Sequence, residues 1–220
     1  MTRIKVCGNT RSQDVELALE LGVELLGFIF TRSPRKISVD DGRALTAGIP
    51  AGVERVGVFI DEPTREIAEA IEACGLTAAQ IYRPLTAADR RLGVSLLPAL
   101  RMQQGAALAN DGFQPGDRPL LDTYRPDRDG GGTGETWDWK VAETLARRYP
   151  IVVSGGLTAG NVGAAIRRLR PWGVDVCSGV EAEPGKKDPE KLRAFVAAVR
   201  EASLPPPPPA GVGVAGGGVS

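Results

Sequence analysis

An acidic residue ends a short apolar stretch in the second half of the chain and is followed by a glycine-rich loop. Leu120 and Leu121 precede Asp122, and Gly130–Gly134 follows. Glycines at this density let backbone N–H groups approach a ligand and let a loop open and close. Parallel α/β enzymes often present an acid or base in this way. Asp122 is therefore a candidate catalytic residue, and an ordinary solvated turn is the alternative.

A thiol near the start of the chain is the second candidate. Cys7 and Lys5 alternate along one apolar stretch, so their side chains are expected on the same face of a strand. A nearby ammonium group favours the thiolate, which can act as a base. The alternative is that Cys7 is a small buried hydrophobe.

The chain has no histidine, which restricts its chemistry. The commonest general base, the commonest zinc ligand and every Ser-His or Cys-His pair are excluded. No carboxylate cluster stands at ligand spacing, so we expect no metal site. Cys74 falls late in a helical pattern and is expected to be structural, whereas the role of Cys177 is left open.

Two short turns combine small residues with a position between an apolar stretch and a helix. They are Ser154–Gly156 and Cys177–Gly179. Backbone N–H groups in such turns can hold a phosphate, and barrel enzymes use the loops after strands seven and eight for this purpose. The candidate phosphate-binding residues are Gly155, Gly156, Ser178 and Gly179.

Short apolar stretches alternate with helical patterns along the chain. The expected strands are Ile4–Cys7, Leu25–Phe30, Val53–Ile60, Ala79–Tyr82, Val94–Leu97, Pro119–Asp122, Ile151–Val153 and Gly173–Cys177. The expected helices are Ser12–Leu21, one capped by Ser38 and Asp41, Thr64–Cys74, a short one after Thr86, Gln103–Asn110, Trp137–Tyr149, Asn161–Leu169 and Asp188–Ala202. This alternation predicts a parallel sheet covered by helices. Eight such units favour an α/β (β/α)₈ TIM barrel over an open doubly wound sheet.

A closed barrel would gather the candidates at one end. Active sites in this fold lie at the carboxyl ends of the strands, where Cys7, Asp122 and both turns are expected. The eighth strand adjoins the first, so Asp175 can lie beside Lys5. A lysine inside a barrel needs a partner, and we therefore expect a Lys5–Asp175 pair below the site.

Composition excludes several classes of protein. Lys plus Arg and Asp plus Glu both number 27 in the 220 residues, and no basic stripe alternates with aromatics, so nucleic acid is not an expected partner. No apolar run has the length of a membrane span or a signal peptide. Three scattered cysteines indicate reduced thiols and a cytoplasmic location. We expect one catalytic domain over residues 1–202 and a disordered tail or linker over the Pro/Gly-rich residues 203–220.

Several motifs stand in the order of one known family. They are Lys5-Val6-Cys7-Gly8, Gly27-Phe28-Ile29-Phe30 with Ser33-Pro34-Arg35, Leu120-Leu121-Asp122 with Gly131-Gly132-Thr133-Gly134, Ser154-Gly155-Gly156-Leu157, and Gly173-Val174-Asp175-Val176 through Ser178-Gly179-Val180-Glu181 to Pro184-Gly185 and Lys187-Asp188. Together they resemble the phosphoribosylanthranilate isomerase family of tryptophan biosynthesis, from about residue 3 to residue 202.

The resemblance implies an activity and roles for three residues. The family converts N-(5-phosphoribosyl)anthranilate, an aminoaldose, to the 1-deoxyribulose 5-phosphate ketose by an Amadori rearrangement without a cofactor. Its general acid maps to Asp122, its general base to Cys7, and the arginine that meets the anthranilate carboxylate to Arg35. The expected partner is a small sugar phosphate, and both monomers and homodimers are compatible with the sequence.

Two positions depart from the family pattern. Gln80-Ile81-Tyr82-Arg83 stands where the family usually has Gln-Leu-His-Gly, and Asn9 replaces a residue that is commonly apolar. Three alternatives stay open. The changed fourth strand suggests a sugar-phosphate-binding barrel without turnover, and the Pro-rich tail suggests a subunit that works docked to another tryptophan enzyme. The third is a related aminoaldose-phosphate isomerase of histidine biosynthesis. The histidine-pathway enzyme has an aspartate at the position of Cys7, which argues against it.

Overall fold

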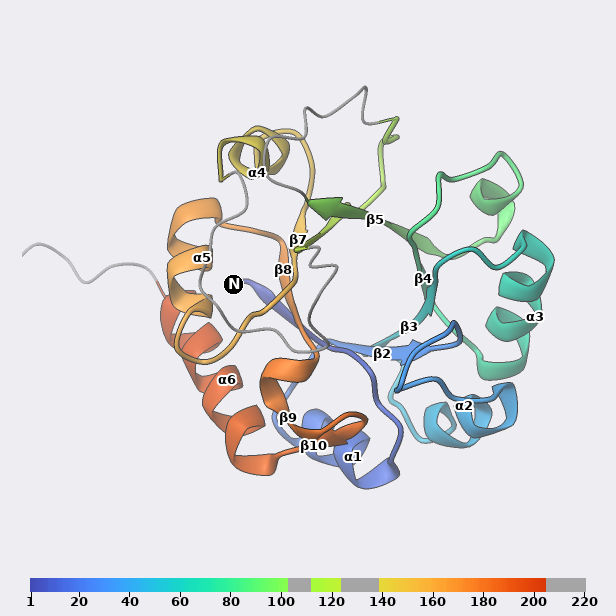
Figure 1. Ribbon diagram of the computed structural model, residues 1–220, viewed down its shortest axis with the longest axis horizontal. Helices are drawn as coiled ribbons and strands as arrows, with labels where there is room; N and C mark the ends of the chain where they lie inside the picture. The colour runs from blue at the N-terminus through green and yellow to red at the C-terminus, as the bar shows by residue number, and fades with distance from the viewer. Residues whose placement is uncertain (103–111, 124–138, 205–220) are drawn as a thin grey trace, which may run out of the picture.

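Eight parallel strands close into a barrel at the centre of the molecule, with helices around it (Figure 1). The computed structural model describes residues 1–102, 112–123 and 139–204. The strands follow one another around the barrel in chain order, and β8 pairs with β1. They are β1 (Arg3–Val6), β2 (Leu25–Ile29), β3 (Glu54–Phe59), β4 (Ala78–Ile81), β5 (Ser95–Met102), β6 (Leu120–Thr123), β7 (Val152–Val153) and β8 (Gly173–Val176). The prediction of a (β/α)₈ barrel is confirmed.

The helices begin and end largely where the sequence predicts. They are α1 (Ser12–Glu20), α2 (Val39–Thr46), α3 (Thr64–Cys74), α4 (Trp139–Ala146), α5 (Val162–Leu169) and α6 (Pro189–Ala202), with short 3₁₀ helices η1 (Asp89–Arg91) and η2 (Ser178–Val180). Ser38 and Asp41 form the expected capping box of α2, which satisfies two backbone N–H groups. Gly75 ends α3 in the left-handed conformation (φ 57°).

The fifth strand is longer than predicted. The sequence predicts its end at Leu97, just before Pro98, but β5 continues to Met102. Its pairing with β4 ends at Pro98, and its pairing with β6 begins at Ala99. The missing N–H donor of Pro98 therefore falls where the strand changes partner, and both ladders remain intact.

Two segments were not foreseen as regular structure, and three predictions fall outside the described range. After β8 the chain forms η2 and a small antiparallel hairpin, β9 (Glu181–Glu183) with β10 (Lys186–Lys187). The predicted helix Gln103–Asn110 and the glycine-rich loop 130–134 lie outside the described residues. So does most of the expected tail over 203–220, which stays a prediction. In the described part of the chain, no helix has the length and apolar character that crossing a bilayer requires.

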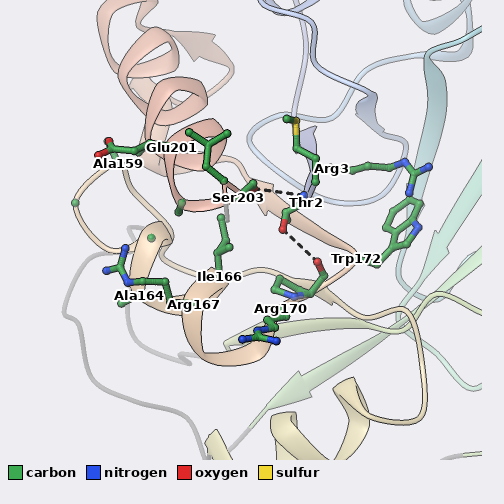
Figure 2. A pocket seen from close by; sticks show the side chains of 17 residues that line it. Thr2, Arg3, Ala159, Ala164, Ile166, Arg167, Arg170, Trp172, Glu201 and Ser203 are labelled. Atoms are coloured by element: carbon green, nitrogen blue, oxygen red, sulfur yellow. Dashed lines mark hydrogen bonds between the residues drawn. The ribbon is translucent and has the colours of Figure 1, made fainter. Parts of the chain in front are cut away.

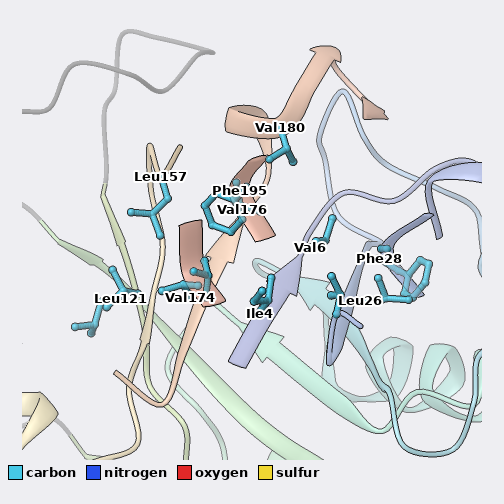
Figure 3. Packing of buried hydrophobic residues seen from close by; sticks show 14 of the residues in the cluster. Ile4, Val6, Leu26, Phe28, Leu121, Leu157, Val174, Val176, Val180 and Phe195 are labelled. Carbon is cyan, nitrogen blue, oxygen red and sulfur yellow. The ribbon is translucent and has the colours of Figure 1, made fainter. Parts of the chain in front are cut away.

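The barrel wall separates two packed regions. Outward side chains of the strands pack against the helices, as Val174 and Val176 of β8 do near Phe195 of α6 (Figure 3). Inward side chains form a separate buried cluster of Leu25, Val56, Ala78, Leu97, Ala99, Leu120 and Val152. This apolar layer fills the barrel below the carboxyl ends of the strands, so polar side chains above it stand on a closed floor.

Candidate active site

Cys7 directly follows β1 and lies at the carboxyl end of the barrel. Its backbone N–H donates to the carbonyl of Val176 on β8 over 2.9 Å, which continues the ladder by one residue. The thiol is buried with Ile29 and Val58, and Tyr82 and Cys177 pack against this small cluster. A side chain on Gly27 would place its Cβ 2.8 Å from the sulfur, so the glycine of β2 leaves room for the thiol.

The surroundings of Cys7 favour the thiolate. A hydrogen bond from Cys177 lowers the pKa of Cys7 to about 7, although burial opposes it and the Lys5 ammonium assists it. The same interaction with Cys7 raises the pKa of Cys177 well above its ordinary value, so Cys177 keeps its proton. The Cys177 thiol also lies 3.9 Å from Glu181 Oε1. The structure thus gives Cys177, left open by the sequence, a position beside the candidate base.

The predicted Lys5–Asp175 pair is confirmed. Lys5 Nζ lies 2.9 Å from Asp175 Oδ1, and both side chains are almost fully buried on the paired strands β1 and β8. Burial by itself lowers the pKa of Lys5, but the Asp175 carboxylate outweighs it and raises the pKa above its ordinary value. Ser154 donates to the other carboxylate oxygen over 2.9 Å. Hydrogen bonds and the ion pair therefore satisfy both side chains in the interior beneath Cys7.

Asp122 lies on β6, across the barrel from β1. Tyr82 donates its hydroxyl hydrogen to Asp122 Oδ2 over 2.8 Å. Burial raises the pKa of the Asp122 carboxyl to about 6, and the Tyr82 hydrogen bond only partly offsets this. Because Tyr82 also packs against the Cys7 cluster, it connects the candidate base and the candidate acid.

The two unusual residues after β4 have separate surroundings. Tyr82 points into the site, whereas Arg83 turns away and binds Asp89 in η1 with two hydrogen bonds of 2.6 and 2.8 Å. Asp89 also accepts from Thr64 and Thr86. Arg83 therefore stabilises the loop after β4. Its guanidinium, at a position where the family usually has glycine, does not lie against Asp122.

Arg35, in the loop after β2, crosses the mouth of the barrel beside Cys7. A Cβ on Gly8 would lie 2.7 Å from Arg35 Cδ and 3.0 Å from Cys177 Sγ. The guanidinium binds Glu181 through Nε at 2.9 Å and Nη2 at 2.6 Å. This two-point geometry fixes the plane of the guanidinium and therefore the direction in which it faces.

Glu181 and Lys187 complete this side of the site, and the sequence analysis did not single them out. Lys187 Nζ lies 2.9 Å from Glu181 Oε1 and also donates to the carbonyl oxygen of Cys7. Burial alone would raise the pKa of Glu181, but the hydrogen bond from Arg35 and the Lys187 ammonium hold it below its ordinary value. Both residues occur in the family motifs, so the sequence could have identified them as candidates. Only the hairpin after β8 brings them beside Cys7.

The two candidate phosphate turns lie against each other. Gly155 and Gly156 adopt left-handed backbone conformations, with φ of 89° and 64°. A Cβ on Gly179 would lie 1.9 Å from the carbonyl oxygen of Leu157, so only glycine lets the turn after β8 approach the turn after β7. Asn161, the residue before α5, donates to the Gly156 carbonyl over 2.9 Å and holds the first turn in place. Ser178 and Gly179 lie in η2, at the same end of the barrel as Cys7.

Other features of the molecule lie away from this group. Cys74 is buried in the core, and its thiol donates to the Val39 carbonyl, as expected of a structural cysteine. Within the described ranges, no group of three His, Cys, Asp or Glu side chains could hold a metal ion. A large open groove lies between α5 and α6 at the amino end of the barrel, near Thr2 and Trp172 (Figure 2). It is at the opposite end from Cys7 and Asp122 and does not contribute to the candidate active site.

Comparison with known proteins agrees with this geometry. A family model described as N-(5′-phosphoribosyl)anthranilate isomerase matches residues 4–198. The isomerase of Pelobacter propionicus is 38% identical over 204 residues, which cover 91% of this chain and 97% of that protein. The crystal structure of phosphoribosyl anthranilate isomerase from Thermotoga maritima superposes with a TM-score of 0.83 at 33% identity, covering 91% of this chain and all of that one.

A second solved structure of a phosphoribosyl anthranilate isomerase carries a bound ligand. It is a complex with reduced 1-(o-carboxyphenylamino)-1-deoxyribulose 5-phosphate, and it superposes with a TM-score of 0.80 at 31% identity, covering 91% of this chain and 100% of that chain. The match spans the barrel from β1 to α6 and includes every strand end that carries a candidate residue. On these grounds the chain belongs to the N-(5′-phosphoribosyl)anthranilate isomerase family.

Proposed function

We propose that this chain converts N-(5-phosphoribosyl)anthranilate to 1-(2-carboxyphenylamino)-1-deoxyribulose 5-phosphate, with Asp122 as general acid and Cys7 as general base. The observation that carries these roles is the pair of opposed pKa shifts at one end of the barrel. Burial raises the pKa of Asp122 to about 6, while the Cys177 hydrogen bond lowers the pKa of Cys7 to about 7. The two pKa values lie close together, so protonated Asp122 and deprotonated Cys7 can be present in the same molecule near neutral pH.

The acid acts first. Asp122 gives its proton to the ring oxygen of the ribose as the bond between C1′ and that oxygen breaks. The lone pair of the anthranilate nitrogen forms a C=N double bond, which yields an open-chain Schiff base and leaves Asp122 as a carboxylate. Tyr82 already donates to Oδ2 of that carboxylate and stabilises its charge.

The base acts on the Schiff base. Cys7 thiolate removes the proton from C2′, and the electrons of that C–H bond move toward the C=N group to give an enolamine. Proton transfer to C1′ and loss of the hydroxyl proton at C2′ then give the ketone. Lys5 and the thiol of Cys177 stabilise the thiolate before it accepts the proton.

Substrate binding is assigned to the rim of the site. Arg35 is the partner proposed for the anthranilate carboxylate, since a planar guanidinium matches a carboxylate and Glu181 already fixes its orientation. Gly155, Gly156, Ser178 and Gly179 are proposed to bind the phosphate through backbone N–H groups. One solved relative consists of monomers generated from the dimeric isomerase of Thermotoga maritima, and for this chain a monomer and a homodimer are both compatible with the proposal.

The test is the loss of phosphoribosylanthranilate fluorescence, with the substrate generated in place from anthranilate and phosphoribosyl pyrophosphate. Removal of an acid or base typically costs about 10²–10⁴-fold in rate. We therefore expect Cys7→Ser and Asp122→Asn each to lower kcat by that amount. Cys74→Ser is the matched control, because it alters a buried thiol in the core and should retain turnover. Full activity in either site variant would contradict the assigned role.

A further inference from the structure

A line of three side chains runs from the interior of the barrel to the candidate acid. Gln80 and Tyr82 alternate along β4 and its extension, so they share the inner face. Gln80 Nε2 donates to the Tyr82 hydroxyl oxygen over 3.1 Å, and Tyr82 donates to Asp122 Oδ2 over 2.8 Å. The Tyr82 hydroxyl thus has one donor and one acceptor partner, and the line ends on the Asp122 carboxyl group.

The direction of this line is determined by its members. An amide nitrogen only donates and an ionised carboxylate only accepts, so the tyrosine hydrogen must point at Asp122. Gln80 is almost fully buried, and its Oε1 has no hydrogen-bond partner among the described residues. Leaving a buried acceptor unpaired costs about 1–3 kcal/mol. Among the described residues, the Tyr82 hydroxyl is the hydrogen-bond partner that the structure gives the Gln80 side chain.

We propose that Tyr82 is a positioning residue for Asp122: by donating to Oδ2 it leaves Oδ1 as the oxygen that carries and delivers the acid proton. Oδ2 accepts from Tyr82 in both states of the carboxyl group, since the carbonyl oxygen of a protonated acid is also an acceptor. The hydrogen bond strengthens as the proton leaves Oδ1 and charge develops on the carboxylate. This inference rests on the proposed function of Asp122.

Tyr82 can serve as a donor throughout the working pH range. Burial and the neighbouring Asp122 carboxylate raise its pKa well above the ordinary value, so the hydroxyl stays protonated. The Arg101 guanidinium of β5 lies 5.2 Å from the centre of the Tyr82 ring, which fixes the ring from one face. Besides the hydrogen bond from the neutral Tyr82, the charges of Asp175, Lys5 and Arg101 act on Asp122.

The first variant is Tyr82→Phe, which keeps the ring and removes the donor. Loss of one hydrogen bond to the carboxylate should raise the titration midpoint of Asp122 by about one pH unit. At acid pH, where Asp122 is protonated in both proteins, the variant acid is weaker and kcat should fall several-fold. At alkaline pH more of the variant keeps its proton, so the difference should shrink or vanish. A purely structural defect would lower kcat by the same factor at every pH.

Two readouts separate this inference from the proposed function. Kinetics give kcat and KM against pH, and the ¹³C resonance of the Asp122 carboxyl carbon, identified with Asp122→Asn, gives its titration without turnover. Tyr149→Phe is the matched control, because Tyr149 packs on Phe113 before β7, and neither readout should change. Gln80→Leu leaves Tyr82 in place and should produce a smaller shift in the same direction, which keeps the test open if Tyr82→Phe does not fold.

The outcomes are distinct. A raised Asp122 midpoint together with a deficit in kcat that shrinks with pH supports the positioning role. An unchanged midpoint in folded Tyr82→Phe overturns it, whatever the turnover. If the wild-type protein shows no turnover but the midpoint moves, the proposed function fails while the effect of Tyr82 on Asp122 stands.

Discussion

The pKa values of the candidate base and the candidate acid shift in opposite directions on the two sides of the barrel mouth. Burial raises the pKa of both Cys7 and Asp122. On the β1–β8 side, Cys177 and Lys5 overcome burial, and the pKa of Cys7 falls to about 7. On the β4–β6 side, Tyr82 does not overcome it, and the pKa of Asp122 rises to about 6. Burial acts in the same direction on both groups, so the difference between the two shifts comes from the hydrogen bonds and charges that oppose it.

The largest effect is expected at Asp175, whose charge acts on both Cys7 and Asp122. Asp175→Asn leaves the buried Lys5 ammonium without its counter-ion, and breaking a buried pair in this way costs about 3–5 kcal/mol. The free energy of unfolding in urea and kcat should both fall. Ser154→Ala, which removes a single hydrogen bond to Asp175, should cost about 1 kcal/mol. Unchanged stability and activity in Asp175→Asn would contradict the role given to the pair.

Burial of Asp122 should make the free energy of unfolding depend on pH. The pKa of Asp122 is raised from 3.8 to about 6 in the folded state, so the folded state retains a proton that the unfolded state loses. The stability of the wild-type protein should fall as pH rises between these values. At about 1.4 kcal/mol per pKa unit, Asp122→Asn should gain at most about 3 kcal/mol over the wild type above pH 6.

Chemical denaturation at several pH values measures this gain. Asp40→Asn, which removes an exposed carboxylate at the start of α2, is the control and should show little pH-dependent difference. A constant difference between Asp122→Asn and the wild type across pH would mean that burial does not raise the pKa of Asp122.

The opposed shifts also predict the pH dependence of catalysis. Turnover needs Cys7 deprotonated and Asp122 protonated, with pKa values of about 7 and about 6. We expect kcat/KM to peak between these values and to fall about tenfold per pH unit on either side. A rate that stays level well above pH 8 would remove Asp122 as the acid.

The smallest effect is expected from the donor on the base side. Cys177→Ala removes the hydrogen bond that lowers the pKa of Cys7, so less thiolate is present at pH 7. The rate of Cys7 alkylation by iodoacetamide should fall several-fold, and its midpoint against pH should move upward. Cys74→Ala should leave that rate unchanged. An equal or faster reaction in Cys177→Ala would show that Cys177 does not stabilise the thiolate.

Much of the fold could be predicted because its determinants are local. Apolar strand patterns and helical patterns depend on neighbours in the chain, as do the residues that begin and end helices. The cap at Ser38 and the helix end at Gly75 lie where these patterns place them. Pro98 was misjudged because its effect depends on which strand pairs with it, and pairing is a tertiary property. The hairpin after β8 gave no periodic signal, since its strands are very short.

Some residues of the candidate site could likewise be predicted from the sequence, whereas others depend on tertiary contacts. The sequence alone determined that Cys7, Asp122 and the two glycine turns follow strands, and the parallel barrel then brings strand ends together, so Lys5 and Asp175 could be paired in advance. Only the tertiary structure decided that Tyr82 reaches Asp122 while Arg83 turns to Asp89, and that Glu181 holds Arg35. Neighbouring residues on a strand leave the backbone in opposite directions, and what each then meets depends on segments distant in the chain.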